Sequence, residues 1–213
     1  MKLRKTKQIN PSQLNADAKR TAQYCVELIS DALTKITGEK VVVSLKYFPD
    51  NITRSSKEKT LPEDNFVKIL AISANAHPNR ADLNVLEKVG DSTPLLALME
   101  ERKNHYYAQD LIKRDNYLRE IGQGKYKDPL ADWEDYYQAV IVVPIRMQET
   151  LLDPNVQEGM DILGFLWAES KSTSAFRKKD IPAYCDFLKG FADILYQYLD
   201  RVDYYENELL HQG

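Results

Sequence analysis

The stretches AVIVVPIR (residues 139–146) and DILGFLWAES (residues 161–170) decide the fold of this chain. Each is a short apolar run between polar segments, rich in β-branched and aromatic residues and without helical periodicity. Such runs are typical of strands covered on both faces, because a strand open to water on one face alternates apolar and polar residues. We therefore expect two central strands joined by a polar loop, with one layer of structure above the sheet and another below it.

Further elements are predicted before this pair of strands. Asn10-Pro11 combines a cap residue with a proline at the first helical position, and it begins a helix that ends at Gly38. Strands are expected over residues 40–48 and 65–73, and a short helix over residues 93–101. The first helix has one apolar stripe at spacings of three and four residues: Ala18, Ala22, Cys25, Ile29, Ala32 and Ile36.

A long last helix is predicted from Asp180, which is a suitable cap residue. Its apolar residues follow an unbroken four-three spacing, typical of a tightly packed helix: Ile181, Cys185, Leu188, Ala192, Leu195, Leu199 and Val202. A second, aromatic stripe recurs every seven residues: Tyr184, Phe191, Tyr198 and Tyr205. Two interpretations stay open, because this stripe is either an interface for a second copy or partner protein, or the rim of a single core.

One domain is expected from the length and composition. The chain has 213 residues, of which 43% are hydrophobic, enough for one large domain or two small ones. We prefer a single domain over residues 12–205, between a basic N-terminal tail (residues 1–11) and a C-terminal tail (residues 206–213). Two cysteines do not make a disulfide framework, and they fit a reducing compartment.

The net charge and the hydropathy of the chain limit the classes of binding partner that we expect. The formal net charge of -3 gives no overall basic surface for nucleic acid. No apolar stretch reaches the ~20 residues that span a bilayer, so we expect a soluble, cytoplasmic protein. The basic start over residues 1–7 would also suit the cytoplasmic flank of a membrane helix that precedes it.

Residues 104–138 differ in composition from the rest of the chain. This segment holds six of the thirteen tyrosines together with Trp133, mixed with acidic and basic residues. Gly122 and Gly124 interrupt any long helix through it. Aromatic rings with a few charges suit a pocket for a planar or amphipathic ligand, and they equally suit a local hydrophobic cluster.

The order of elements over residues 12–205 resembles that of the GAF domain family. The resemblance rests on IVVPIR and ILGFLWAES, followed by Phe176 and Asp180 before the long terminal helix. It implies an α+β fold in which an antiparallel sheet carries the first and last helices on one face. The Tyr-rich insertion (residues 104–138) is then a lid on the other face, above a small-molecule pocket. PAS domains share much of this layout.

The residues needed for the catalytic and cofactor-binding functions of some GAF domains are not found in this sequence in the required arrangement. Reduction of methionine sulfoxide needs cysteines that meet in the pocket, whereas Cys25 and Cys185 lie on the helices expected on the other face. Bilin attachment usually uses a Cys-His pair, which the sequence lacks. The histidines have no metal-ligand spacing, and no nucleophile, base and orienting partner can be assembled. We therefore predict neither catalysis nor a metal site, and the cofactor is unknown.

Candidate ligand-binding residues follow from the implied lid and from strand alternation. In the strand over residues 161–170, one face is expected to hold Leu163, Phe165, Trp167 and Glu169, and the other Ile162, Gly164, Leu166 and Ala168. The small residues suit the close approach of a helix, so Phe165 and Trp167 are expected to face the pocket. Arg146 is expected to pair with an anionic ligand, or in an ordinary salt bridge with Asp110 or Glu169. The predicted ligand-binding residues are Tyr106, Tyr107, Trp133, Tyr136, Tyr137, Arg146, Phe165 and Trp167.

Two functions stay open. In the first, the protein is a sensor or regulatory domain, and a small molecule shifts the population of its terminal-helix arrangements. In the second, it is an interaction or dimerisation module without a ligand, and it uses the aromatic stripe of the last helix. An open pocket lined by Trp133, Tyr137 and Trp167 would favour the sensor, and a pocket filled by side chains would favour the module.

Overall fold

The computed structural model describes residues 11–48, 65–78, 86–100, 103–122, 124–128, 132–146 and 162–210, with side chains for those between 16 and 199. The α-helices are α1 (Pro11–Thr37), α2 (Thr93–Glu100), α3 (Leu111–Glu120) and α4 (Ile181–Leu210). The strands are β1 (Val42–Tyr47), β2 (Phe66–Ile72), β3 (Leu86–Lys88), β4 (Tyr106–Ala108), β5 (Ala139–Arg146) and β6 (Ile162–Ser170). Three short 3₁₀ turns complete the description: η3 (Val89–Asp91), η4 (Trp133–Asp135) and η6 (Lys178–Asp180).

The strands form one antiparallel sheet in the order β3-β2-β1-β6-β5-β4. The two apolar runs form β5 and β6, which pair from Ala139 opposite Ser170 to Arg146 opposite Ile162. This confirms them as strands of a covered sheet. The edge strands β3 and β4 were missed, because three residues are too few to show a period-two pattern. The polar loop expected between β5 and β6 lies outside the described residues.

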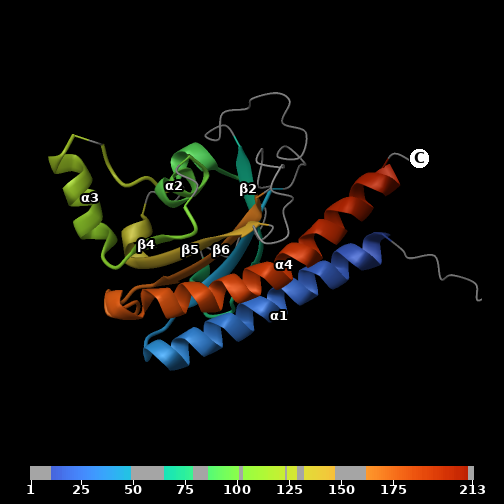
Figure 1. Cartoon of the computed structure of the whole chain (residues 1–213), viewed down its shortest axis with the longest axis horizontal. Helices are drawn as coiled ribbons and strands as arrows, with labels where there is room; N and C mark the ends of the chain where they lie inside the picture. The colour runs from blue at the N-terminus through green and yellow to red at the C-terminus, as the bar shows by residue number, and fades with distance from the viewer. Residues whose placement is uncertain are drawn as a thin grey trace, which may run out of the picture.

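Helices α1 and α4 cover one face of the sheet and lie side by side in opposite directions (Figure 1). The apolar core beneath them draws on alternate residues of the central strands, such as Val43, Ile141 and Leu166. α1 is also tied to β2, because Gln23 Nε2 donates a hydrogen bond to the Ile72 carbonyl oxygen at 2.8 Å. The predicted placement of both terminal helices on one face is confirmed.

The buried face of α1 differs in part from the predicted stripe. Its buried apolar side chains are Ala18, Ala22, Val26, Ile29 and Leu33. Ile36 is 57% exposed, which corrects the prediction for this residue. It lies in the last turn of the helix, just before the chain changes direction at Gly38 with φ 73°. A glycine is suited to this left-handed conformation because it has no Cβ atom.

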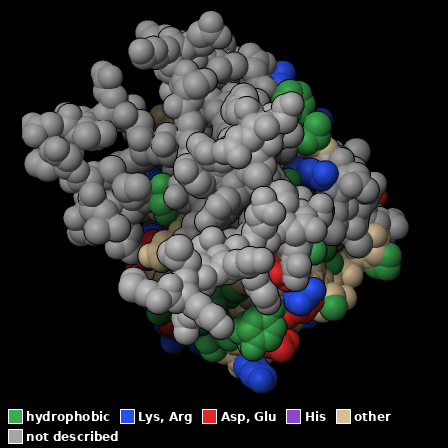
Figure 2. All heavy atoms as spheres, turned by 90° about the vertical axis from the view of Figure 1, so that its right-hand side faces the viewer, with side chains coloured by type: hydrophobic (Ala, Val, Ile, Leu, Met, Phe, Trp, Pro, Cys, Tyr) green, Lys and Arg blue, Asp and Glu red, His purple; other side chains and the backbone are tan. Residues whose placement is uncertain are grey.

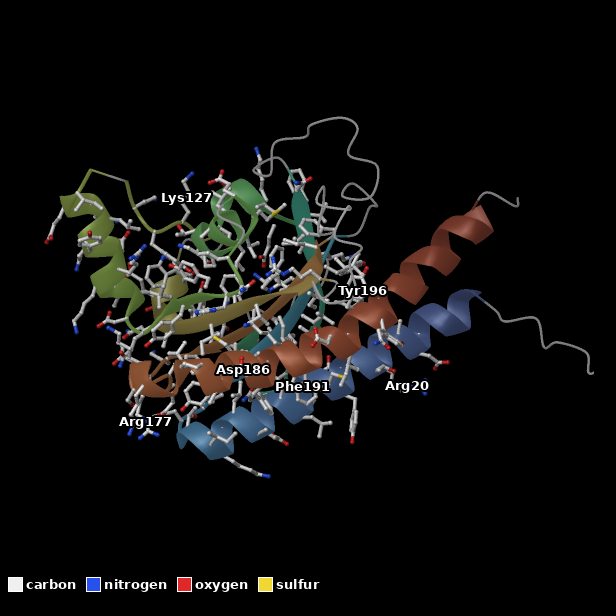
Figure 3. The ribbon with its side chains drawn as sticks, in the orientation of Figure 1. Arg20, Lys127, Arg177, Asp186, Phe191 and Tyr196 are labelled. Carbon is white, nitrogen blue, oxygen red and sulfur yellow. The ribbon has the colours of Figure 1, made fainter. Side chains whose placement is uncertain are left out.

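The last helix, α4, buries its predicted apolar seam. Its seam residues in the described part are at most 7% exposed: Ile181, Cys185, Leu188, Ala192, Leu195 and Leu199. In the aromatic stripe, Tyr184 is buried with its ring centre 5.9 Å from that of Phe176, whereas Phe191 and Tyr198 are half-buried. Phe191 packs against the core on this face, on the stretch of α4 that runs beside α1 (Figure 3). The side chains of Val202 and Tyr205 lie outside the described residues.

The opposite face of the sheet is covered by α2, α3 and η4 (Figure 1). α3 begins after Asp110, whose side chain accepts a hydrogen bond from the backbone N–H of Lys113 at 2.9 Å. A second apolar core lies beneath this cover, with Leu95 and Leu98 from α2 and Leu111 and Leu118 from α3. The insertion therefore lies where the resemblance implied.

Gly164 marks a close approach of two strands rather than of a helix. A Cβ atom at this position would lie 2.2 Å from the Lys46 carbonyl oxygen of β1. The register of β5 against β6 shifts nearby, between Ile145 and Arg146. Leu163 therefore packs beneath the terminal helices, on the face opposite to Phe165. This corrects the prediction of a shared face, since alternation fails where strand pairing is irregular.

Candidate functional site

The aromatic side chains predicted to line a pocket fill the space under the insertion. Trp133, Tyr137, Phe165 and Trp167 are between 0% and 6% exposed. The ring centres of Tyr137 and Trp167 lie 6.4 Å apart in an edge-to-face arrangement, and those of Trp133 and Tyr137 lie 5.9 Å apart. Edge-to-face contacts are among the favoured geometries of buried aromatic pairs. In the described part of the molecule these rings form a packed cluster, which we call the lid cluster.

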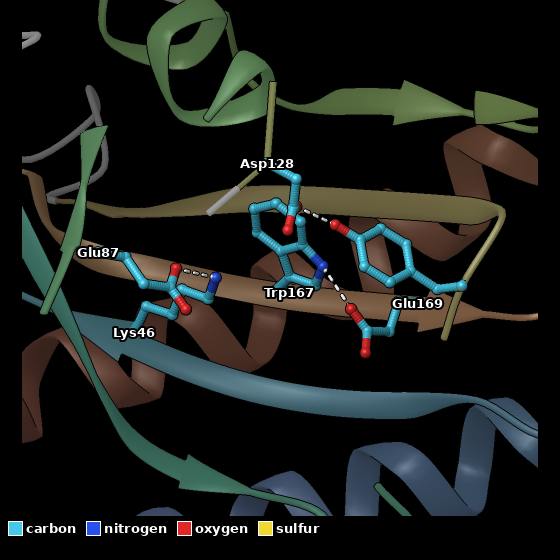
Figure 4. Close-up of polar contacts among 6 residues, drawn as sticks. Lys46, Glu87, Asp128, Trp167 and Glu169 are labelled. Atoms are coloured by element: carbon cyan, nitrogen blue, oxygen red, sulfur yellow. Dashed lines mark hydrogen bonds and ion pairs between the residues drawn. The ribbon is translucent and has the colours of Figure 1, made fainter. Parts of the chain in front are cut away.

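A polar network runs through the lid cluster (Figure 4). Lys46 of β1 is 2% exposed, and its Nζ atom forms an ion pair with Glu87 of β3. The same Nζ atom lies 4.2 Å from the centre of the Trp167 ring, within the range of cation–π attraction. Trp167 Nε1 donates a hydrogen bond to Glu169 Oε2 at 2.9 Å. The indole is therefore held between a buried cation and a buried carboxylate.

Two carboxylates hold the insertion in place. Asp115 of α3 is 7% exposed and accepts hydrogen bonds from the Tyr126 backbone N–H and from Arg119 Nε. Tyr137 Oη donates to Asp128 (Figure 4). Burial raises the pKa of Tyr126 well above its ordinary value, and the nearby charge of Asp128 acts in the same direction. The Tyr126 hydroxyl therefore stays protonated at neutral pH.

A cavity of about 550 Å³ lies at the end of the sheet where β1 begins and where β2 and β6 end. We call it the sheet-end cavity. Its volume falls within the ~300–1,000 Å³ typical of small-molecule sites. The described lining residues are Glu39, Lys40, Val42, Asn75, Ala76, His77, Pro78, Asp135, Tyr136, Glu169, Ser170, Lys171 and Ser172. Four segments that are far apart in the sequence thus meet at one site.

The lining of the sheet-end cavity combines a buried acid with an aromatic pair. Glu169 is 3% exposed, the lowest value among the charged residues that line it. The ring centres of His77 and Tyr136 lie 4.8 Å apart. Lys40 and Lys171 are exposed, and their long side chains extend toward solvent-accessible space. Buried polar groups that line a cavity orient a ligand, while the aromatic walls supply contact area.

The predicted ligand-binding residues separate into groups. Tyr106 joins the lid cluster, whereas Tyr107 packs against the core on the opposite face, and its hydroxyl donates to the Phe176 carbonyl oxygen at 2.9 Å. Neighbouring residues of a strand point to opposite faces, so the pair could not share one site. Arg146 Nη2 donates to Asn104 Oδ1, which corrects the expectation of Asp110 or Glu169 as its protein partner. Of the eight predicted residues, Tyr136 is the one among the described lining of the sheet-end cavity.

Lys46 and Glu87 were not identified as buried residues from the sequence. In β1, Ser44 and Lys46 alternate with Val43 and Leu45, a pattern that usually indicates a polar face open to water. Both polar residues are nevertheless buried beneath the insertion. The expectation of a cover on both faces of the sheet was the one signal that could have identified Lys46 as a buried cation.

The two cysteines lie on the helix side of the sheet, away from the lid cluster. Burial raises the pKa of the Cys185 thiol to about 11, and it also raises the pKa of Cys25. Both thiols are therefore protonated at neutral pH, and the thiolate is the reactive form. Among the described residues, no group of three or more His, Cys, Asp and Glu side chains could hold a metal ion.

The outer surface of the terminal helices carries apolar side chains. Tyr24 is 64% exposed, Leu28 42% and Ile194 61%. Seen from the side at which α4 ends, the described side chains are a mixture of hydrophobic, basic and acidic groups (Figure 2). In the part of the chain that the structure describes, no helix has both the length and the apolar character needed to cross a membrane.

Solved structures similar to this chain include several GAF domains. The GAF domain of Acinetobacter phosphoenolpyruvate-protein phosphotransferase has 11% identity and a TM-score of 0.52, with 90% of each chain covered. The GAF domain region of a putative membrane protein from Geobacter sulfurreducens PCA has 12% identity and a TM-score of 0.52, covering 89% of this chain and 97% of that one. A type II free methionine-R-sulfoxide reductase from Thermoplasma acidophilum has 17% identity and a TM-score of 0.50, covering 87% and 97%.

These similarities show a GAF-like fold, which confirms the resemblance seen in the sequence. No protein-family model matches the sequence, and no curated protein matches it. At identities below 20% the neighbours show the fold alone, so function has to be argued from the site.

Proposed function

We propose that this GAF-like domain is a non-catalytic sensory or regulatory domain that binds a small molecule in the sheet-end cavity. The observation that carries the proposal is a cavity of about 550 Å³ in which the buried carboxylate of Glu169 also accepts the indole hydrogen bond of Trp167. A ligand that contacts Glu169 would thereby act on the lid cluster. This moves the proposed ligand from beneath the insertion, where side chains fill the described space, to the end of the sheet.

The position of the cavity also supports signalling through the terminal helices. Glu39 and Lys40 follow α1 after the single residue Gly38, and residues 169–172 lead through η6 into α4. The two segments are hydrogen-bonded to each other, since Ser170 Oγ donates to the Lys40 carbonyl oxygen at 2.7 Å. A ligand between them would favour one relative placement of α1 and α4 over others. It can shift that equilibrium only by its difference in affinity for the two arrangements.

Native mass spectrometry of the protein purified from its own host tests the proposal. We expect an additional small mass that mild activation releases. Hydrogen exchange should then be slower with the retained molecule than after its removal, both at residues 39–42 and at residues 169–180. A bare polypeptide mass at all activation energies, combined with identical exchange before and after dialysis, would contradict a ligand-binding sensor.

An interaction module is the second candidate function. The packed lid cluster and the exposed apolar residues Tyr24, Leu28 and Ile194 of the terminal helices favour it. Under this proposal the outer helix surface, rather than the half-buried Phe191, meets a second copy or another protein. Light scattering of Ile194→Glu against wild type tests this, with Ile112→Glu on the exposed face of α3 as a matched control. A dimer that dissociates only in Ile194→Glu would support the module, and an unchanged mass in every variant would contradict self-association.

We also propose that the two cysteines take no part in catalysis. The similarity to a methionine sulfoxide reductase raises the question, because such chemistry needs a reactive thiolate. Both thiols are on helices that pack against the face of the sheet opposite to the lid cluster, and burial raises the pKa of each. A variant with Cys25→Ala and Cys185→Ala should therefore retain any ligand that the wild-type protein binds.

A further inference from the structure

We infer that the sheet-end cavity binds a small organic cation that carries N–H donors, such as a protonated primary amine, and that Glu169 is its counter-ion. This inference rests on the proposed function, because it names the ligand class of the same cavity. A carboxylate has about four lone-pair sites on its two oxygens. Glu169 can therefore accept an ammonium N–H in addition to the interactions that it already makes, among them the hydrogen bond from Trp167 Nε1.

The burial of Glu169 makes it the decisive charge of the cavity. It is 3% exposed, whereas Asp135, Lys40 and Lys171 are exposed. Electrostatic attraction is stronger at a buried group, because less water screens it. The exposed lysines can extend into solvent at little cost, and the buried carboxylate cannot leave the site. An anionic ligand would have to approach this carboxylate, which like-charge repulsion disfavours.

The aromatic wall of the cavity suits the same ligand class. The rings of His77 and Tyr136 lie against each other at 4.8 Å, and Tyr136 Oη donates to Asp132 Oδ2 at 3.0 Å, which fixes the tyrosine ring. Aromatic faces attract organic cations through the ring quadrupole. The apolar side chains of Val42, Ala76 and Pro78 supply contact for a hydrocarbon body. An ammonium group on a small apolar body therefore complements the acid, the rings and the apolar wall together.

A matched set of three probes tests the charge preference on the wild-type protein. The probes are 2-phenylethylamine, which is protonated at neutral pH, 2-phenylethanol, which is neutral, and phenylacetate, which is anionic. Their affinities are measured by titration with ligand-observed NMR, after dialysis has removed any retained molecule. We expect the amine to bind at least about tenfold more tightly than the alcohol, a difference of about 1.4 kcal/mol, and phenylacetate to bind more weakly than either.

Two charge-removing variants test the role of Glu169. In Glu169→Gln the amide oxygen can still accept from the Trp167 indole, so this hydrogen bond is kept while the charge is lost. We expect the affinity for 2-phenylethylamine to fall at least about tenfold and that for 2-phenylethanol to change less than about twofold, a difference that mere loss of packing would not produce. Glu134→Gln removes an equal charge from an exposed position of η4 outside the cavity lining, and it should leave both affinities unchanged.

The outcomes separate this inference from the proposed function. Equal binding of the amine to wild type and Glu169→Gln would overturn the inference, as would tighter binding of the alcohol or the acid. If Glu169→Gln does not fold, the order of the three probes on the wild-type protein still decides. Binding of the alcohol or the acid in the cavity would leave a ligand-binding sensor intact with another ligand class. Binding of none of the probes would overturn the amine class, and native mass spectrometry of the host-purified protein would judge the sensor separately.

Discussion

Replacement of Lys46 by methionine tests whether the polar network under the insertion is truly buried. Methionine keeps most of the length and apolar volume of the lysine stem and removes its charge. Lys46 is 2% exposed and the Glu87 side chain 9% exposed, so the variant leaves a carboxylate in a desolvated site without its cation. Removal of one partner of a buried ion pair typically costs ~3–5 kcal/mol. Loss of the cation–π contact with Trp167, at 4.2 Å, acts in the same direction.

Urea denaturation followed by circular dichroism measures this loss as a change in the free energy of unfolding. We expect Lys46→Met to lose about 3–5 kcal/mol, a large share of the ~5–15 kcal/mol that stabilises a typical domain. The control is Lys113→Met, which breaks the ion pair with Asp110 at 3.1 Å on an 85% exposed lysine. Exposed pairs contribute only about 0–1 kcal/mol, so this variant should resemble wild type.

A double variant separates burial of charge from loss of packing. In Lys46→Met combined with Glu87→Met, no uncompensated charge remains, and apolar replacement of a buried pair is often neutral or stabilising by ~1–4 kcal/mol. We therefore expect the double variant to recover most of the stability that the single variant loses. Equal losses in Lys46→Met and Lys113→Met, or a double variant as unstable as Lys46→Met, would refute the reasoning.

Three further changes have defined outcomes. Gly164→Ala should lower the free energy of unfolding by at least ~1–3 kcal/mol, because its Cβ atom would lie 2.2 Å from a β1 carbonyl oxygen. The control is Gly190→Ala in α4, whose Cβ atom meets nothing within 4 Å and which should be neutral or stabilising in thermal melts. Burial alone would raise the pKa of Asp110. Hydrogen bonds from Lys113 and from the Ile112 backbone N–H, together with the positive charge of Lys113, outweigh burial and lower this pKa below 3.8. The stabilising contribution of the Asp110 carboxylate is therefore present above pH 3.8 and is lost as the pH falls through the lower folded-state pKa. In urea titrations Asp110→Ala should cost ~1 kcal/mol of unfolding free energy at neutral pH and less at about pH 2.5. Cys25 and Cys185 should react with iodoacetamide at neutral pH far more slowly in the native protein than in urea, and fast native labelling of Cys185 would contradict its raised pKa.

The main layers of the fold could be predicted because they depend on long apolar patterns. β5 and β6 are buried along almost their whole length, so a continuous apolar run indicated strands covered on both faces. In α4 the four-three spacing indicated the seam that the structure buries. β3 and β4 escaped notice because each has only three residues. The face of Leu163 was wrong because strand alternation fails near the register shift between Ile145 and Arg146.

The candidate site was less accessible to sequence reasoning. Its lining comes from four separate segments, and only tertiary structure brings Lys40, His77, Tyr136 and Glu169 to one end of the sheet. Aromatic composition correctly drew attention to the insertion, but composition cannot tell a packed cluster from an open pocket. Tyr136 was the exception, because it lies at the edge of the aromatic segment where the packed rings end and the cavity begins.

The ion pair between Lys46 and Glu87 also restricts how the sheet can assemble. β3 is an edge strand, and an inward-pointing charge on an edge strand discourages pairing with other chains. A slip of β3 by one residue would turn Glu87 outward and bring Lys88 or Leu86 toward Lys46, so only the observed register neutralises the cation. The same two side chains thus select one alignment during folding and make the sheet edge a poor template for aggregation.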